Sequence, residues 1–434
     1  MKRIALLALI FCFATGTALA ARQPEATFTP RCDGSQIDIH VSVRHGRVRC
    51  AELWEAHFLS PNQRRDRFEN VMQMQPQDGD FHLSVSLPEY EYKKFYVRLV
   101  FDRPADATLR SQTFTADASS LLTPNATPEG DMLYGDISRT GVPFSKDPHV
   151  IRFGGRYLMY YSIPPRPDDK ASGWNIGIAE SRDLRQWEKV GELTPAEGLE
   201  YESRGLCAPC ALVRDGEVHL FYQTYGGGRS DAICHAVSSD GLTFRRNPTN
   251  PIFSPKGEGW TCGRAIDAEV CEFRGRYYLY FATRDTDYRR QQLGVATAPA
   301  GTDFSRDAWT QAADTTILFP LLPWEKNCIE APSICIRGRR MYMFYAGAYN
   351  NEPQQVGVAV SRDGIHWQRL SDKPFLANGP AGSWNESESG HPHIFTDRDG
   401  KTYLFYQGNR THGKNWFLSQ RRVVWKRGKP KFAK

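Results

Sequence analysis

The chain has 434 residues, of which 40% are hydrophobic and 24% charged, and this composition excludes an intrinsically disordered protein. The formal net charge is +6 at pH 7, and it falls to +4 without Lys2 and Arg3, which lie in a segment that we expect to be removed. A dispersed charge of this size does not indicate a nucleic-acid partner.

Residues 1–20 have the pattern of a secretory signal peptide. Two basic residues are followed by an apolar run and by a small-residue end, Ala18-Leu19-Ala20. The run is too short for a membrane-spanning helix, and no later stretch reaches that length. We therefore expect a secreted or periplasmic protein without a membrane span.

Residues 21–125 predict a small β-sandwich domain. Segments 36–58, 80–101 and 111–118 alternate apolar and polar residues at period two, as half-buried strands do. This domain is either a carbohydrate-binding module or a packing partner for the domain that follows, and "LLTPNATPEG" is typical of a linker. In an oxidising compartment, Cys32 and Cys50 are plausible partners in a local disulfide.

Residues 126–434 contain one phrase five times. "DPHVIRFGGRYLMYY" begins at Asp147, and similar phrases begin at Ala208, Asp267, Glu330 and His391, at intervals of 61, 59, 63 and 61 residues. Each copy reads as an apolar strand, a tight turn and a second strand that ends in aromatic residues. A recurrence of this kind predicts a repeat architecture.

A second phrase follows four of the five copies. "NIGIAESRDLRQW" and its counterparts, such as "QVGVAVSRDGIHW", predict a third strand, a polar turn and an outer fourth strand. Four antiparallel strands every 60 residues or so predict a five-bladed β-propeller, so the fold class is all-β. The last copy lacks the turn phrase, and the joint that closes the ring is not visible in the sequence.

The residues that begin the five first strands are unusual. In a propeller the innermost strands surround the axis, so Asp147, Asp267, Glu330 and His391 should converge at one mouth of the channel. Carboxyl groups held close together raise each other's proton affinity, so one can stay protonated while another is ionised. Hydrolysis of a glycosidic bond requires such an acid and base pair.

The motifs "KDPHVI", "AIDAEV" and "IEAPSI", in this order and spacing, resemble those of glycoside hydrolase family 43. The resemblance covers residues 130–434 and implies that Asp147 is the general base, Glu330 the general acid, and Asp267 the residue that tunes and orients the acid. It implies an inverting hydrolase of arabinofuranosides, xylosides or galactosides. Asp-Ala in the third blade and Glu-Ala-Pro in the fourth depart from the family pattern.

"SGHPHIF" resembles the family element "GPGH", which implies that His391 lies on the channel axis, where many members hold a hydrated calcium ion. We expect no cofactor to be required for the chemistry itself. His149 and His393 lie two residues further along their strands, and packing is their predicted role. Cys207 and Cys210 have C-x-x-C spacing, but a zinc site of that type needs a second pair, and none is evident.

The loops ahead of the first strands should shape a sugar pocket, because an aromatic ring covers the apolar face of a sugar. The candidate substrate-binding residues are Trp260, Trp324, Arg264, Trp384 and Tyr201. Glu388 is a further candidate for contact with a hydroxyl group.

Three alternatives remain open at this point. The first is a non-catalytic carbohydrate-binding propeller, and the second is a relative of glycoside hydrolase family 117, which cleaves agar oligosaccharides with a histidine acid. The third is a sialidase, which the sequence disfavours because no triad of arginines is visible. In each case the expected partner is an oligosaccharide or polysaccharide, and we expect a monomer.

Overall fold

The computed structural model describes residues 24–32, 36–57, 69–75, 79–86, 92–103, 107–112, 114–117, 132–166 and 173–433. The predicted signal peptide and linker lie outside these ranges. Among the described residues, no helix is both long and apolar enough to cross a membrane. The chain divides into two compact units, residues 1–125 and 126–434.

The first unit is built from two antiparallel sheets. One sheet has the order β1 (Glu25–Cys32), β2 (Gln36–Arg44) and β5 (Phe81–Ser86). The other has the order β4 (Glu69–Met74), β3 (Arg47–His57), β6 (Tyr92–Arg103) and β7 (Thr108–Arg110), with β8 (Phe114–Asp117) also paired to β6. Alternate residues of both sheets form one buried apolar cluster, as the period-two pattern predicts.

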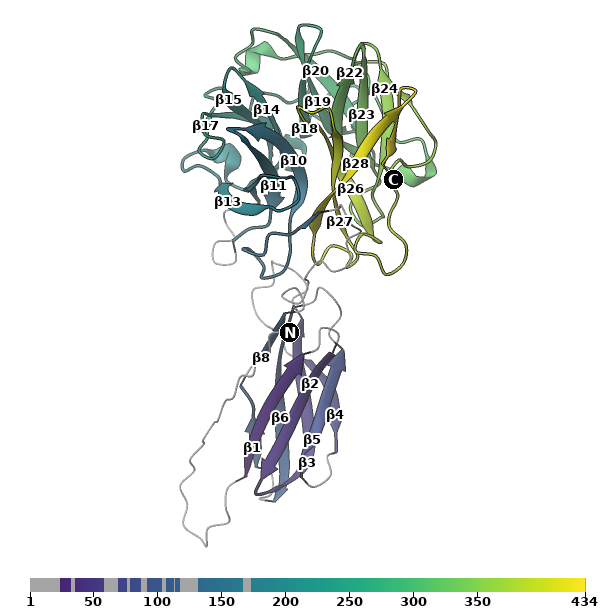
Figure 1. Ribbon diagram of the computed structural model, residues 1–434. Helices are drawn as coiled ribbons and strands as arrows, with labels where there is room; N and C mark the ends of the chain where they lie inside the picture. The colour runs from purple at the N-terminus through teal and green to yellow at the C-terminus, as the bar shows by residue number, and fades with distance from the viewer. Residues whose placement is uncertain are drawn as a thin grey trace. The chain divides into compact units, whose positions relative to one another are not determined.

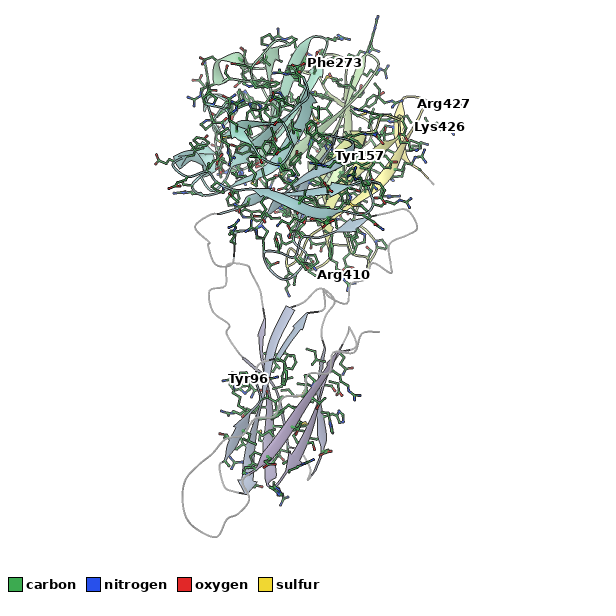
Figure 2. All side chains as sticks on the ribbon, turned by 60° about the vertical axis from the view of Figure 1, so that its left-hand side comes forward. Tyr96, Tyr157, Phe273, Arg410, Lys426 and Arg427 are labelled. Carbon is green, nitrogen blue, oxygen red and sulfur yellow. The ribbon has the colours of Figure 1, made fainter. Side chains whose placement is uncertain are left out.

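One cysteine and one aromatic cluster of this unit have defined contacts. Cys50 is a buried free thiol that accepts a hydrogen bond from Gln73, so the predicted disulfide with Cys32 is wrong. On strand β6, Tyr96 stacks on Trp54 at a ring separation of 5.9 Å, and the Arg110 guanidinium lies 3.7 Å from the centre of the Tyr96 ring (Figure 2).

The second unit consists of five sheets, each of which forms one blade with its strands in sequence order (Figure 1). Blade one comprises β10 (Lys146–Phe153), β11 (Arg156–Ile163), β12 (Asn175–Ser181) and β13 (Glu188–Leu193). Blade two comprises β14 (Leu206–Arg214), β15 (Glu217–Thr224), β16 (Ile233–Ser238) and β17 (Arg245–Arg246). Blade three comprises β18 (Ile266–Phe273), β19 (Arg276–Arg284), β20 (Gln291–Pro299) and β21 (Thr310–Gln311).

Blade four comprises β22 (Ile329–Arg337), β23 (Arg340–Gly347), β24 (Gln355–Ser361) and β25 (Gln368–Arg369). Blade five comprises β26 (Glu388–Thr396), β27 (Thr402–Asn409), β28 (Phe417–Lys426) and β29 (Lys429–Phe432). The first strands contact one another in a closed cycle, β10–β14–β18–β22–β26–β10. The predicted all-β fold with a five-bladed propeller is confirmed.

A short strand closes the ring. β9 (Leu133–Tyr134) lies ahead of the first blade in the sequence, yet it pairs with Leu418 and Ser419 of β28 in the last blade. The start and the end of the domain are therefore hydrogen-bonded within one sheet. Two residues carry too little periodicity for a sequence pattern to reveal such a strand.

The polar turns between third and fourth strands have the predicted chemistry. The Oδ1 atom of Asp183 accepts hydrogen bonds from the backbone N–H groups of residues 185 and 186, and Asp240 and Asp363 repeat this arrangement. These aspartates stabilise turns at the outer part of the blades.

In two of the loops that lead into first strands, a buried glutamate forms an ion pair with an arginine of the outer strand of the same blade. Glu202, in the loop before β14, pairs with Arg246, and Glu325, in the loop before β22, pairs with Arg369. Neither glutamate is exposed, and Glu325 also accepts a hydrogen bond from the Tyr345 hydroxyl at 2.8 Å.

Candidate active site

Each first strand contains a β-bulge at the position that the repeat analysis singled out. The strand pairing shifts between the residues on either side of the bulge in all five blades. One residue in each bulge has a positive φ, between 43° and 53°; these are Asp147, Ala208, Asp267, Ala331 and His391. A bulge turns the side chain of that residue away from ordinary strand alternation, toward the channel.

The bulge corrects the predicted alignment of the fourth blade. Its bulge residue is Ala331, so Glu330 corresponds to Lys146 of the first blade and not to Asp147. A slip of one residue normally sends a side chain to the other face of a strand. The Glu330 side chain nevertheless reaches the site: its Oε1 atom lies 3.8 Å from His391 Nε2.

The structure brings the three predicted carboxyl groups together around the imidazole of His391. His391 Nδ1 lies 3.2 Å from Asp147 Oδ1, and His391 Nε2 lies 3.8 Å from Asp267 Oδ2 as well as from Glu330. None of the four side chains is more than 10% exposed. Residues up to 244 positions apart in sequence therefore form one buried polar cluster at the propeller axis.

Amide side chains from neighbouring blades fix the backbone of the bulges. The Asp147 N–H donates to Gln407 Oε1 at 3.0 Å, and the Asp267 N–H donates to Gln223 Oε1 at 2.8 Å. Sequence analysis missed both glutamines. A signal for them was present, because "LFYQ" occurs at the end of a second strand twice, at 220–223 and 404–407.

Two further glutamines, also missed, position the candidate acid. Gln354 Nε2 donates to Glu330 Oε1 at 2.7 Å, and Gln291 Nε2 donates to Glu330 Oε2. The Oε1 atom of Gln354 accepts the backbone N–H of His391 at 3.0 Å. Only glycine fits at position 390, because a Cβ atom there would lie 1.8 Å from that oxygen. One amide thus couples the glutamate to the histidine.

Burial and charge give the carboxyl groups different proton affinities. Burial, together with the charges of the nearby Glu330 and Asp147, raises the pKa of Asp267 to about 7 against the opposing effect of His391. Burial acts against ionisation of Asp147 too, but His391 and Lys146 lower the pKa of this group below its usual value. Despite burial, the surrounding carboxylates raise the pKa of His391. The cluster therefore combines an ionised carboxylate with a carboxyl group that keeps its proton up to about neutral pH.

Lys146 is a cation of the site that sequence analysis did not identify. Its ammonium group lies 4.7 Å from the centre of the Trp416 ring and 5.8 Å from that of Trp174. Despite burial, the carboxylates of Asp147 and Glu388 raise its pKa. A lysine held between aromatic rings beside the candidate base is well placed to contact a polar substrate.

The three tryptophans predicted to bind substrate have packing contacts in the structure. The ring of Trp324 stacks on Tyr345 at 6.0 Å, and the ring of Trp384 lies 5.7 Å from that of Tyr406. Trp260 lies 6.5 Å from Phe281. Each indole also covers a glycine whose Cβ would come within 2.4–2.7 Å of it; these glycines are Gly294, Gly347 and Gly408. A contact of these tryptophans with sugar stays a prediction.

The remaining candidates differ in their distance from the chemistry. Arg264 donates to Gln291 Oε1 at 3.2 Å and is close enough to Asp267 to lower its pKa. Tyr201 is partly buried against the apolar core of blades one and two. Glu388 is fully buried and accepts a hydrogen bond from Gln407 at 3.1 Å, so it positions Gln407, and its contact with a sugar hydroxyl stays a prediction.

The predicted calcium ion has suitable donors here. Asp147 Oδ1 and Asp267 Oδ2 are buried, and neither has a hydrogen-bond partner among the described residues. Both are carboxylate oxygens, the ligand type that Ca²⁺ prefers. The two aspartates and His391 therefore fit a hydrated calcium ion on the axis.

Comparison with known proteins places matches over the propeller domain. The model of the family "Glycosyl hydrolases family 43" matches residues 142–429. Among solved structures, a thermostable family-43 glycoside hydrolase is similar with a TM-score of 0.54 and 20% identity, over 69% of this chain and 96% of that chain. An α-L-arabinofuranosidase from Lactobacillus brevis has a TM-score of 0.52 and 16% identity, over 67% of this chain and 94% of that chain. At these identities the structures establish a shared fold.

Curated relatives match shorter segments. A β-1,2-mannobiose phosphorylase of Thermoanaerobacter sp. (strain X514) is 29% identical over 132 residues, which are 27% of this chain and 41% of that protein. An uncharacterized protein of Mycobacterium tuberculosis (strain CDC 1551 / Oshkosh) is 27% identical over 164 residues, 36% of this chain and 51% of that protein. The chain thus spans about half the length, or less, of these relatives. The family model, in contrast, covers almost the whole propeller, and the chain belongs to glycosyl hydrolase family 43.

Proposed function

We propose that the propeller hydrolyses glycosidic bonds with inversion of the anomeric configuration, with Asp147 as the base and Glu330 as the acid. The observation that carries this proposal is the position of His391, which contacts Asp147, Asp267 and Glu330 within 3.8 Å at one end of the channel. A protein that only binds sugar has no need to bury three carboxyl groups around one imidazole, since their burial is costly.

The charge of Asp147 suits the role of base. Because its pKa is lowered, Asp147 is a carboxylate that can take a proton from water while the water oxygen bonds to the anomeric carbon. As the glycosidic C–O bond breaks, protonated Glu330 transfers its proton to the leaving oxygen. Asp267 would orient this acid through His391, whose Nε2 atom lies 3.8 Å from both carboxyl groups. The four glutamines around the cluster hold these groups in place before substrate binds.

Bound calcium, held near Asp147, Asp267 and His391, would supply positive charge that offsets the buried carboxylates. We further propose that the protein is secreted or periplasmic and that it acts as a monomer. The substrate class we infer is a pentose-containing or galactose-containing oligosaccharide or polysaccharide. Similar folds include the arabinofuranosidase above and an endo-1,4-β-xylanase from Bacteroides thetaiotaomicron VPI-5482 (21% identity, TM-score 0.52, 67% of this chain and 94% of that one).

A second candidate assigns the acid role to His391, as in the family 117 relatives considered above. The observation in its favour is that the surrounding carboxylates raise the pKa of His391 despite its burial, so that the imidazolium is available as a proton donor. The acid assignment can be decided by comparing Glu330→Gln with His391→Asn on one substrate. The variant that lacks the true acid should lose activity on unactivated substrates but retain more of it on aryl glycosides with good leaving groups.

The experiment that tests the function is a product-release screen. Arabinofuranosides, xylosides, galactosides, sialosides and agar oligosaccharides are incubated with the protein, with and without inorganic phosphate, and the anomer released first is identified by proton NMR. We expect hydrolysis of one class with an inverted product. Phosphate-dependent release of a sugar phosphate, or a retained anomer, would refute the mechanism; binding without turnover across the panel would favour the non-catalytic propeller.

A further inference from the structure

A second ring of polar residues lies next to the catalytic cluster in the channel. We call it the inner ring; its members each follow the bulge of one blade by two residues, and they are His149, Cys210, Glu269, Ser333 and His393. All five are buried, with exposed fractions of 1% to 6%. A buried position of this kind normally holds an apolar side chain, yet all five blades place a polar group or a thiol there, and four of the five are of a type that binds metal ions.

The two histidines have one defined tautomer. His149 Nε2 lies 2.8 Å from the Ala211 carbonyl oxygen, and His393 Nε2 lies 3.0 Å from the Val150 carbonyl oxygen. A carbonyl can only accept, so each Nε2 carries the hydrogen and each neutral ring keeps its lone pair on Nδ1. This is the arrangement of metal-binding histidines, whose other ring nitrogen donates to a backbone carbonyl.

The carboxylate of Glu269 completes the donor set. Its Oε1 atom accepts the backbone N–H of Ile334 at 2.7 Å, and its Oε2 atom lies 3.8 Å from His149 Nδ1. One ligand atom each from His149, Glu269 and His393 can be chosen so that all lie within 4.8 Å of one another. The rings of His149 and His393 are 3.8 Å apart, and both line the axial cavity together with Glu269.

We propose that the inner ring binds one divalent transition-metal ion of the zinc class through His149, His393 and Glu269. Ligands that stand 2.0–2.1 Å from tetrahedral zinc are about 3.4 Å apart, so small side-chain rotations would close the set. Two imidazole donors disfavour calcium, which takes oxygen ligands, and this separates the inner ring from the predicted calcium site around His391.

The ion would link β10, β18 and β26, the first strands of three blades, and its role would be structural. The inference does not depend on the proposed hydrolysis.

The test uses the full chain without an affinity tag, stripped with a chelator and reloaded with zinc or calcium. We expect about one zinc per chain by mass spectrometry of metals after desalting, and a zinc-dependent rise in the thermal unfolding midpoint. His149→Gln keeps a donor for the Ala211 carbonyl but removes the Nδ1 ligand, and it should lower the zinc content at least about tenfold. Glu269→Gln tests the carboxylate independently if the first variant fails to fold.

Matched controls make the result specific. His219→Gln replaces a buried histidine that pairs with His235 outside the channel, and it should retain zinc. Anomalous diffraction at the zinc edge should place the ion between His149, Glu269 and His393. A wild-type chain that binds no zinc, inner-ring variants that still bind it, or loss of zinc only in His391→Asn would each overturn the proposal.

Discussion

Replacement of Asp147 by asparagine isolates the chemical role of one oxygen. Asp147 is a bulge residue with φ of 53°, and asparagine tolerates this conformation better than most residues do. The substitution keeps the backbone N–H that donates to Gln407 and changes almost no volume. The fold and the sugar pocket should therefore persist, while the group that accepts the proton from water is lost.

The expected loss follows from the role of a general base. Such groups contribute about 10²- to 10⁴-fold to the rate, which corresponds to about 3 to 5 kcal/mol of transition-state stabilisation. We expect kcat/KM of Asp147→Asn to fall by this factor, with substrate affinity changed by less than about threefold. Because Asp147 is the charge that lies 3.2 Å from His391, the pKa of His391 should also fall, and NMR of the imidazole can follow this.

The assay combines turnover on the substrate found in the screen with calorimetric binding and a thermal melt. Asp183→Asn is the matched control, since Asp183 makes the same kind of turn hydrogen bonds in an outer loop and an amide oxygen can still accept them. That variant should keep full activity. Turnover of Asp147→Asn within about threefold of wild type would refute the assignment of the base.

Three further predictions concern the acid, the pH dependence and the loops. Glu330→Gln should lose about 10²- to 10⁴-fold in kcat/KM on oligosaccharides but much less on activated aryl glycosides, and equal losses on both would contradict its role as acid. The pKa of Asp267 rises from 3.8 to about 7 on folding, so the folded state holds an extra proton between these values and the wild type loses stability as pH rises through this window. Asp267→Asn should therefore gain about 2 to 3 kcal/mol relative to wild type between pH 5 and pH 8 in denaturant titrations, and a difference that does not change with pH would argue against the buried proton. Arg369→Met leaves the fully buried Glu325 without its partner and should lower the free energy of unfolding by about 3 to 5 kcal/mol; a loss below about 1 kcal/mol would show that the pair contributes little.

The strands and the repeat could be predicted because their causes are local. Strand periodicity needs only alternation over a few residues, and the 60-residue recurrence needs only comparison of the chain with itself. Since the repeats of a propeller surround one axis, equivalent positions must converge. This reasoning was enough to place Asp147, Asp267 and His391 in one cluster.

The tertiary structure decided what depends on neighbours from other blades. The bulge makes Ala331, not Glu330, the equivalent of Asp147. The proline that follows Ala331, like those that follow Asp147, Ala208 and His391, was the overlooked sequence signal for this register. The two-residue strand β9 closes the ring through a partner almost 290 residues away. The structure also shows that Trp260, Trp324 and Trp384 cover glycines of their own blades, a packing contact that the sequence does not reveal.

By itself, then, the sequence determined the all-β repeat and the acidic residues that gather at its axis, since both follow from short-range pattern and symmetry. Only the folded chain decided which glutamines hold those acids, how far His391 stands from each of them, and that His149 and His393 face Glu269. Burial and the distances between side chains of different blades set the proton affinities and donor geometry, and neither quantity exists before the ring closes.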